Sequence, residues 1–330
     1  MDKGAEGDCN LTQRTKKQHH TPRFYLDAFA AGTANHRSLW VFDRKEKKWF
    51  QSSPSNIGCV NDFYDVDIED NRNIIEELYS KNESIAAPII RAVLESREIP
   101  SDRQERGELL NFIGLQALRG EAIRSSMSDF KVLTAKIIFE RLAANPKSLK
   151  NTLLAIGTDP SELEETAAKI ADGIKNEHYR FVPAKEGLIE SVLKLTDPMY
   201  ELMWERKWEI IVPESLKTQF ITSDNPVVLT NLALSGNEEE YLINRVGFGA
   251  SGSSVIFALS PNFALHGLFG GIENRVLADD LLVRVVNGRI INQAVRQIYS
   301  SQKDICIEVN NCPTKSFNKY LEINCRREKS

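Results

Sequence analysis

The first part of the chain passes from a polar stretch to alternating apolar and polar positions. Residues 1–17 hold few apolar side chains and predict a flexible tail. Two β-rich runs, Leu39–Phe42 and Trp49–Gln51, flank a charged turn and predict a β-hairpin with one apolar face. A further short strand is expected at Asn61–Val66. The chain is therefore expected to begin with β structure.

A helical pattern follows the predicted hairpin. Between residues 73 and 96, apolar positions recur at close to the 3.6-residue period of an α-helix. Pro100 breaks this pattern, and Ser101 with Gln104 has the spacing of a capping box for a second long helix. That helix is expected to run from Asp102 through Arg124 and, after a bend, to Ala144. Two more helices are expected, one opened by Asp159–Glu162 and one over Lys185–Glu205.

The second half of the chain returns to β-like patterns. The runs rich in Val, Ile, Thr and Phe are KWEIIVP, TQFITSDNPVVLT, GSSVIFALSP and NFALHGLF, with KDICIEV as a closing strand. Between them, Leu281–Ser300 has a helical period. These patterns predict an α+β fold in which the hairpin and the C-terminal strands form a central antiparallel or mixed sheet. A long-helix subdomain at about 72–206 is expected to be inserted between the hairpin and the C-terminal strands. Residues 18–330 are expected to form one compact domain, because no long linker separates the parts.

Two polar residues fall on the apolar stripe of the second long helix. Gln116 and Arg119 lie three to four residues from its apolar members, which are Leu109, Phe112, Ile113, Ile123 and Phe130. A buried guanidinium without a partner costs several kcal/mol, so Arg119 needs one. With antiparallel helices and a rise of about 1.5 Å per residue, Arg119 lies between the levels of Glu83 and Glu76. We therefore predict a Glu83–Arg119 ion pair, with Glu76 beside it, as either a structural pair or part of a site.

A turn signal lies between two predicted strands in the second half. Asp224 and Asn225 precede Pro226, and Asx side chains that bond the backbone favour a turn there. Asp224 would project from the end of a strand, where functional groups often gather. The alternative is an Asx turn that carries no chemistry.

Composition and charge narrow the function classes. Hydrophobic residues make up 42% and charged residues 27% of the 330 residues, which is typical of a globular protein. The net charge of −4 does not favour a protein that coats nucleic acid. The chain has no apolar run long enough for a membrane span and no signal-peptide pattern, so a cytoplasmic location and no membrane partner are expected. The five cysteines lack C-x-x-C spacing and predict neither a disulfide framework nor a zinc site.

Several motifs together resemble a known family. The opening H-x-x-P-x-x-Y-L-x-x-F pattern is formed by His19, Pro22, Tyr25, Leu26 and Phe29. It is followed in order by LWVFDR, LLNFIGLQALR, TSDNPV, FALSP and NGRIINQAVRQIYSS. This series is similar to the family called domain of unknown function 4238, from about residue 18 to 300. The resemblance implies a shared fold and site but no established activity. His20 stands where the family pattern suggests an aromatic residue, so His19 is the member that carries the family's histidine.

The candidate residues suggest a hydrolase-type enzyme. We expect a catalytic set of His19, Glu83, Arg119 and Asp224, with Gln116, Asn225 and Glu76 as ligand-binding residues. His19 suits general acid or base catalysis near neutral pH, and Arg119 suits an anion such as phosphate. The carboxylates could instead hold a divalent metal such as magnesium as cofactor. That set suits cleavage of a phosphodiester or a nucleic acid.

The competing hypothesis is a non-catalytic module that binds a small molecule or a partner. In it, the same polar residues form a buried network that fixes the helices against the sheet. Nucleic-acid binding through the basic N-terminal segment is a third hypothesis, based on Arg14, Lys16, Lys17 and Arg23.

Overall fold

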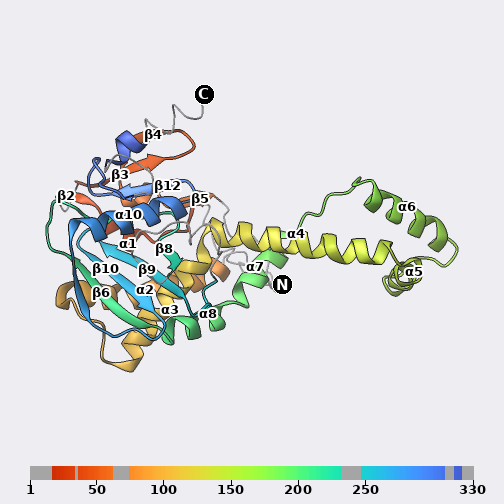
Figure 1. Cartoon of the computed structure of the whole chain (residues 1–330), viewed down its shortest axis with the longest axis horizontal. Coiled ribbons are helices and arrows are strands. Elements are labelled where there is room, and N and C mark those ends of the chain that lie inside the picture. The colour runs from red at the N-terminus through yellow and green to blue at the C-terminus, as the bar shows by residue number, and fades with distance from the viewer. Residues whose placement is uncertain (1–16, 34–35, 62–73, 232–246, 309–315, 322–330) are drawn as a thin grey trace, which may run out of the picture. The chain divides into compact units, whose positions relative to one another are not determined.

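The computed structural model describes residues 17–33, 36–61, 74–231, 247–308 and 316–321 (Figure 1). Helices and separate sheets confirm the α+β class. The chain divides into two compact units, which are described separately below. The first comprises Met1–Gly120 and Thr196–Ser330, and the second comprises Glu121–Leu195. Of the helical region expected at about 72–206, residues 121–195 thus form a unit of their own.

The predicted hairpin is present in the first unit. Strands β3 (His36–Asp43) and β4 (Lys48–Ser52) pair antiparallel. The sheet continues in the order β2–β3–β12–β7, where β2 is Ala31–Thr33, β12 is Gln297–Ser300 and β7 is Thr222–Ser223. The N-terminal hairpin therefore joins C-terminal strands, as predicted.

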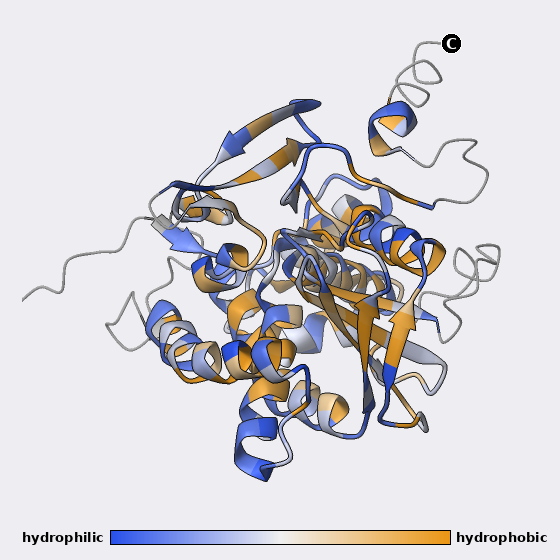
Figure 2. Cartoon of the chain, turned by 90° about the vertical axis from the view of Figure 1, so that its left-hand side faces the viewer, coloured by the Kyte–Doolittle hydropathy of each residue, from blue (hydrophilic) through white to orange (hydrophobic). Residues whose placement is uncertain are grey.

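The C-terminal half also forms a sheet of its own, so the single central sheet is corrected to two. Its order is β11–β6–β10–β9–β8, with bounds Arg275–Ala278, Lys207–Pro213, Phe263–Leu268, Ser253–Ser260 and Val227–Asn231. The β11–β6 pair is parallel and the other neighbours are antiparallel. Strands β9 and β10 are buried on both faces, which explains their nearly continuous apolar sequences (Figure 2). A short third sheet pairs β1 (Lys17–His19) with β5 (Cys59–Asn61).

Helices cover both faces of the five-stranded β11–β8 sheet. The helices of this unit are α1 (Arg23–Asp27), α2 (Ile74–Ser96), α3 (Arg103–Arg119), α8 (Thr196–Trp204) and α10 (Asp280–Gln293), with a 3₁₀ turn at Pro54–Asn56. On one face, Phe257 of β9 stacks with Tyr25 of α1 at 5.1 Å and lies edge-on to Phe112 of α3 at 6.1 Å between ring centroids. On the other face, Arg289 of α10 donates to the Thr230 hydroxyl of β8. Side-chain alternation along paired strands places Thr230 and Phe257 on opposite faces.

The second unit consists of α4 (Glu121–Ala143), α5 (Pro146–Ala155), α6 (Leu163–Lys175) and α7 (Lys185–Leu193). Its small core is formed by Leu149, Leu153 and Ala167, with Leu142 and Ile170 packed against it. No helix in the described ranges is both long enough and apolar enough to cross a membrane.

Several predicted element boundaries need correction. Helix α3 ends at Gly120, whose extended backbone separates it from α4. The apolar stripe therefore does not continue, and Phe130 is 62% exposed instead of buried. The expected helix at 185–205 is two helices, α7 and α8. The helix expected at 281–300 is also too long. Helix α10 ends at Gln293, and Gln297–Ser300 forms strand β12, which pairs with β3 and β7.

Three further predictions fall partly outside the described residues. The tail at 1–17 lies outside them except for Lys17, and so does the expected strand at 61–66 except for Asn61. In the KDICIEV segment, Cys306 forms an isolated bridge with Ser316, and no named strand is present over the described residues 303–308.

Candidate functional site

The predicted ion pair between the two long helices of the first unit is present. Helix α2 is followed by a short connection and then by α3, whose N-cap is Asp102. The Asp102 carboxylate accepts hydrogen bonds from the backbone N–H groups of Gln104 and Glu105 at 2.9 Å, so the N-cap of α3 is Asp102 and not the predicted Ser101. At the other end of α3, an Arg119 Nη1 donates to Glu83 Oε1 of α2. The geometric prediction for Arg119 and Glu83 is confirmed.

The Arg119 guanidinium is enclosed by protein groups. Its side chain is 1% exposed, against 22% for Glu83. The second terminal nitrogen, Nη2, donates to the backbone carbonyl of His19 in β1. The Tyr79 ring lies under the guanidinium at 4.4 Å. Arg119 therefore ties β1 to α2 and α3, and His19 meets it through its main chain.

A second carboxyl, that of Glu76, belongs to the same cluster. It accepts a hydrogen bond from the His19 backbone N–H and is influenced by Arg119 and Glu83. Burial raises the pKa of Glu76; Arg119 opposes this shift and the Glu83 carboxylate adds to it. Its Oε2 is buried and has no hydrogen-bond partner among the described residues. Two carboxyl groups with different surroundings thus lie beside one guanidinium.

Gln116 is a buried amide on the same face of α3. It precedes Arg119 by three residues and is 2% exposed. Within the part of the chain that the structure describes, neither its Oε1 nor its Nε2 has a hydrogen-bond partner. Buried amides are nearly always hydrogen-bonded, so this side chain is suited to hold a water molecule or a ligand group.

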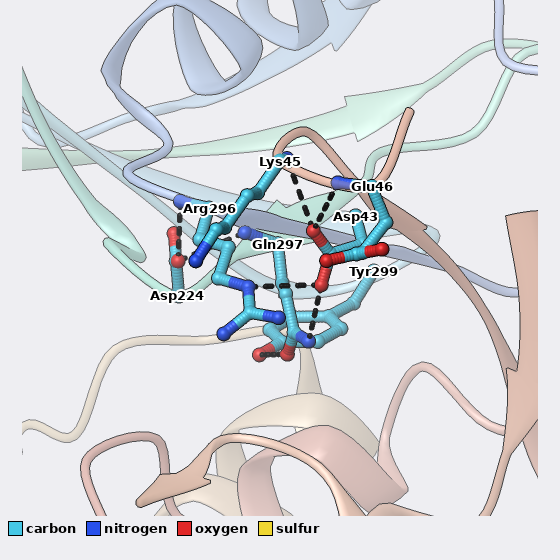
Figure 3. A network of polar contacts seen from close by, with 7 residues as sticks. All are labelled: Asp43, Lys45, Glu46, Asp224, Arg296, Gln297 and Tyr299. Carbon is cyan, nitrogen blue, oxygen red and sulfur yellow. Dashed lines mark hydrogen bonds and ion pairs between the residues drawn. The ribbon is translucent and has the colours of Figure 1, made fainter. Parts of the chain in front are cut away.

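The last two candidate residues, Asp224 and Asn225, lie at the turn between β7 and β8, and Figure 3 shows the network around Asp224. The buried Asp224 carboxylate accepts from three backbone N–H groups, those of Val295 (2.9 Å), Arg296 (2.7 Å) and Gln297 (2.8 Å). The Asn225 amide donates to the Gln293 carbonyl at 3.0 Å. These contacts fit the alternative of a turn without chemistry, because they fix the chain that leads into β12.

Asp43 extends this network and was missed by the sequence analysis. It is 2% exposed and accepts from the N–H groups of Lys45 and Glu46 and from Arg296 Nε at 2.9 Å (Figure 3). Burial would raise the pKa of Asp43, but the hydrogen bonds from Glu46, Gln297 and Arg296 outweigh it, so the pKa is lowered. The position of Asp43 at the end of the apolar strand β3 could have indicated it in the sequence, because a buried carboxylate needs hydrogen-bond partners.

A chain of contacts connects the two networks. The Tyr299 hydroxyl donates to Gln297 Oε1 at 3.0 Å and accepts from the Gly58 N–H. The Gly58 carbonyl accepts from the His20 N–H at 2.9 Å. Burial, with Asp224 adding to it, raises the pKa of Tyr299, so this hydroxyl keeps its proton. Asp224 is thereby linked through the backbone to the segment that carries His19.

Two further buried polar residues were not predicted. The Tyr25 hydroxyl lies 2.7 Å from Thr222 Oγ1 and donates to the Ala258 carbonyl at 2.6 Å, which joins three of the quoted motifs. Arg206 is fully buried and donates to the Ser253 carbonyl and hydroxyl and to the carbonyls of Phe248 and Gly267. Burial lowers the pKa of Arg206 to about 10. Its contacts anchor the Gly- and Ser-rich segment at residues 247–254.

The stability of the protein should depend on pH through Glu76. Because its pKa is raised, the folded state holds this proton more tightly than the unfolded chain. The contribution is complete below the ordinary glutamate pKa and is lost as the pH rises through the raised value. Denaturant titrations between about pH 4 and 8 should therefore show wild-type stability falling relative to Glu76→Gln. The exposed neighbour supplies a control, Glu77→Gln, and a constant difference for Glu76→Gln would contradict the prediction.

Comparisons with known proteins place the chain in a family. A model of the family described as "Protein of unknown function (DUF4238)" matches residues 17–304. No curated protein and no solved structure matches the chain. Among the described residues, no group of three or more His, Cys, Asp or Glu side chains is placed to hold a metal ion. A role for magnesium therefore gains no support from these residues.

Proposed function

The chain belongs to the DUF4238 family, and we propose that it is a hydrolase whose acid and base are Glu76 and Glu83. Glu76, protonated, gives a proton to the leaving group. Glu83, paired with Arg119, accepts a proton from the attacking water. Gln116 binds a polar group of the substrate through its amide. This site uses residues of the first unit only.

The observation that carries the proposal is the contrast between the two carboxyl groups. Glu83 pairs directly with a guanidinium, whereas burial raises the pKa of Glu76, and one of its oxygens has no hydrogen-bond partner in the described ranges. Paired carboxyls in unlike environments are the usual arrangement for acid–base hydrolysis, because one keeps its proton while the other stays ionised. In a network that served stability alone, the second carboxyl would add its hydrogen bond from the His19 N–H but also repulsion from Glu83.

The charge of the cluster bears on the substrate. It holds two carboxyl groups and one guanidinium, and both terminal nitrogens of that guanidinium are already engaged by Glu83 and His19. A phosphodiester or nucleic acid would bring a negative charge to a guanidinium that Glu83 and His19 already engage, and burying a charge without a counter-ion is costly. An uncharged glycosidic, ester or amide bond suits the site better, so we propose an uncharged substrate.

A matched pair of variants tests the proposal. The full chain is assayed with chromogenic glycosides, esters, amides and phosphodiesters, and the hydrolysed class is measured for Glu76→Gln and Glu77→Gln. Loss of a general acid should reduce the rate by at least about 100-fold in Glu76→Gln, while Glu77→Gln retains it. Equal rates in both variants would exclude Glu76 as the acid.

A non-catalytic binding module is the second candidate, favoured by the contacts of Asp224. Its carboxylate accepts from the backbone N–H groups of Val295, Arg296 and Gln297, as in a structural turn. If the wild type hydrolyses none of the four substrate classes but Gln116→Leu alters ligand-induced stabilisation in a compound screen, the binding module is the better description.

A further inference from the structure

Helix α4 of the second unit carries an apolar stripe that its own unit does not cover. The members are Phe130, Leu133 and Ile137, which are 62%, 58% and 43% exposed. Their spacing of three and four residues places them on one face of the helix. None of the side chains of α4 is fully buried. A contiguous apolar stripe of this kind marks an interaction surface.

The helix packs on its own unit through its other side. Phe139 contacts Phe181 at 5.0 Å between ring centroids, and Leu142 packs against the small core of α5 and α6. At about 100° per residue, Phe139 points half a turn away from Phe130. The stripe therefore faces away from the core that holds the unit together.

The charged residues along one edge of the stripe can pair with the same residues of a second copy of the helix when the two helices run antiparallel. Asp129 and Lys136 lie on that edge, two helical turns apart, and have opposite charges. When two such helices run antiparallel, this edge faces its own counterpart, so Asp129 of each meets Lys136 of the other. Lys136 is 43% exposed and also contacts Glu177 and Glu140 of its own unit. In a parallel pair, the same edge would face Thr134, and the complementarity would be absent.

We propose that a second copy of this chain covers the stripe, with α4 antiparallel to its counterpart. The two-fold axis passes near Leu133, so that Phe130 of each copy packs on Leu133 of the other. The stripe is buried, and two Asp129–Lys136 pairs flank it. The homodimer is independent of the proposed hydrolysis, since it uses the second unit only.

The mass of the full chain in solution tests the dimer. Light scattering after gel filtration should give twice the chain mass of 37.3 kDa for the wild type. Leu133→Asp should halve the mass, because a carboxylate would be buried in the apolar seam. Leu154→Asp, at a position 43% exposed on α5, is the control and should remain dimeric. Circular dichroism checks that both variants keep their helices.

Charge reversal tests the antiparallel orientation. Asp129→Lys and Lys136→Asp alone should each weaken the dimer by about tenfold, because each creates two like-charge contacts. The double variant Asp129→Lys/Lys136→Asp should regain the wild-type dissociation constant. A wild type that stays monomeric at about 100 μM would overturn the proposal, and so would a dimer that Leu133→Asp leaves intact. A double variant as weak as the single ones would overturn the antiparallel arrangement.

Discussion

Arg119→Met should lower the free energy of unfolding of the first unit by about 3–5 kcal/mol. The substitution keeps an apolar side chain of similar length but removes the charge. It leaves the Glu83 carboxylate beside Glu76 without its counter-ion and the His19 carbonyl without its donor. Breaking a buried pair costs more than the pair contributes, because the remaining charge stays desolvated.

Tryptophan fluorescence during denaturant unfolding measures the stability of the first unit, which contains Arg119. All four tryptophans lie in the first unit, at Trp40, Trp49, Trp204 and Trp208, so the second unit does not contribute to the signal. The control is Arg106→Met on the same helix. Arg106 pairs with Glu273, and these side chains are 19% and 36% exposed, so the loss should be about 1 kcal/mol or less.

A second substitution separates the pair from its surroundings. In the Arg119→Met/Glu83→Gln double variant, the carboxylate that lost its counter-ion is neutral, so part of the stability should return. If Arg119→Met costs no more than Arg106→Met, the ion pair is not buried in solution.

Asp224→Asn should destabilise the first unit by about 2–4 kcal/mol. The carboxylate accepts from Val295, Arg296 and Gln297 with both oxygens. An asparagine keeps only one acceptor oxygen, so its NH₂ group meets at least one backbone donor in a buried place. The entry of the chain into β12 would lose its anchor.

Asp279→Asn is the matched control for this substitution. Asp279 caps α10 and accepts from the Leu282 N–H at 2.8 Å. Asparagine is about as good an N-cap as aspartate, so the stability should change little. A catalytic role for Asp224 would be favoured if Asp224→Asn left stability unchanged and abolished hydrolysis of a substrate identified in the assays above.

The Arg119–Glu83 pair shows which predictions the sequence supports well. Helix α2 has a clear 3.6-residue period, and a short connection makes α2 and α3 antiparallel neighbours. Counting residues from that connection is then enough to pair side chains, because the rise per residue is constant. The same reasoning was wrong for Phe130, since a break at Gly120 changes the direction of the stripe.

The two sheets mark the limit of this kind of reasoning. The hairpin and most C-terminal strands are visible as local patterns, whereas the pairing of β12 with β3 and β7 joins segments far apart in the chain. Gln297–Ser300 forms a strand despite its helical sequence period, because the backbone N–H and C=O groups of β12 form hydrogen bonds with β3 and β7.

The α+β class, the family, the hairpin and the contact of Arg119 with Glu83 can all be predicted from the amino-acid sequence, because each rests on local periodicity, a motif or the helical rise per residue. Three features needed the folded structure: Asp224 anchors a turn, burial raises the pKa of Glu76, and α4 has an exposed apolar face. These depend on which groups surround a side chain, and burial and hydrogen bonding are set by segments distant in the sequence.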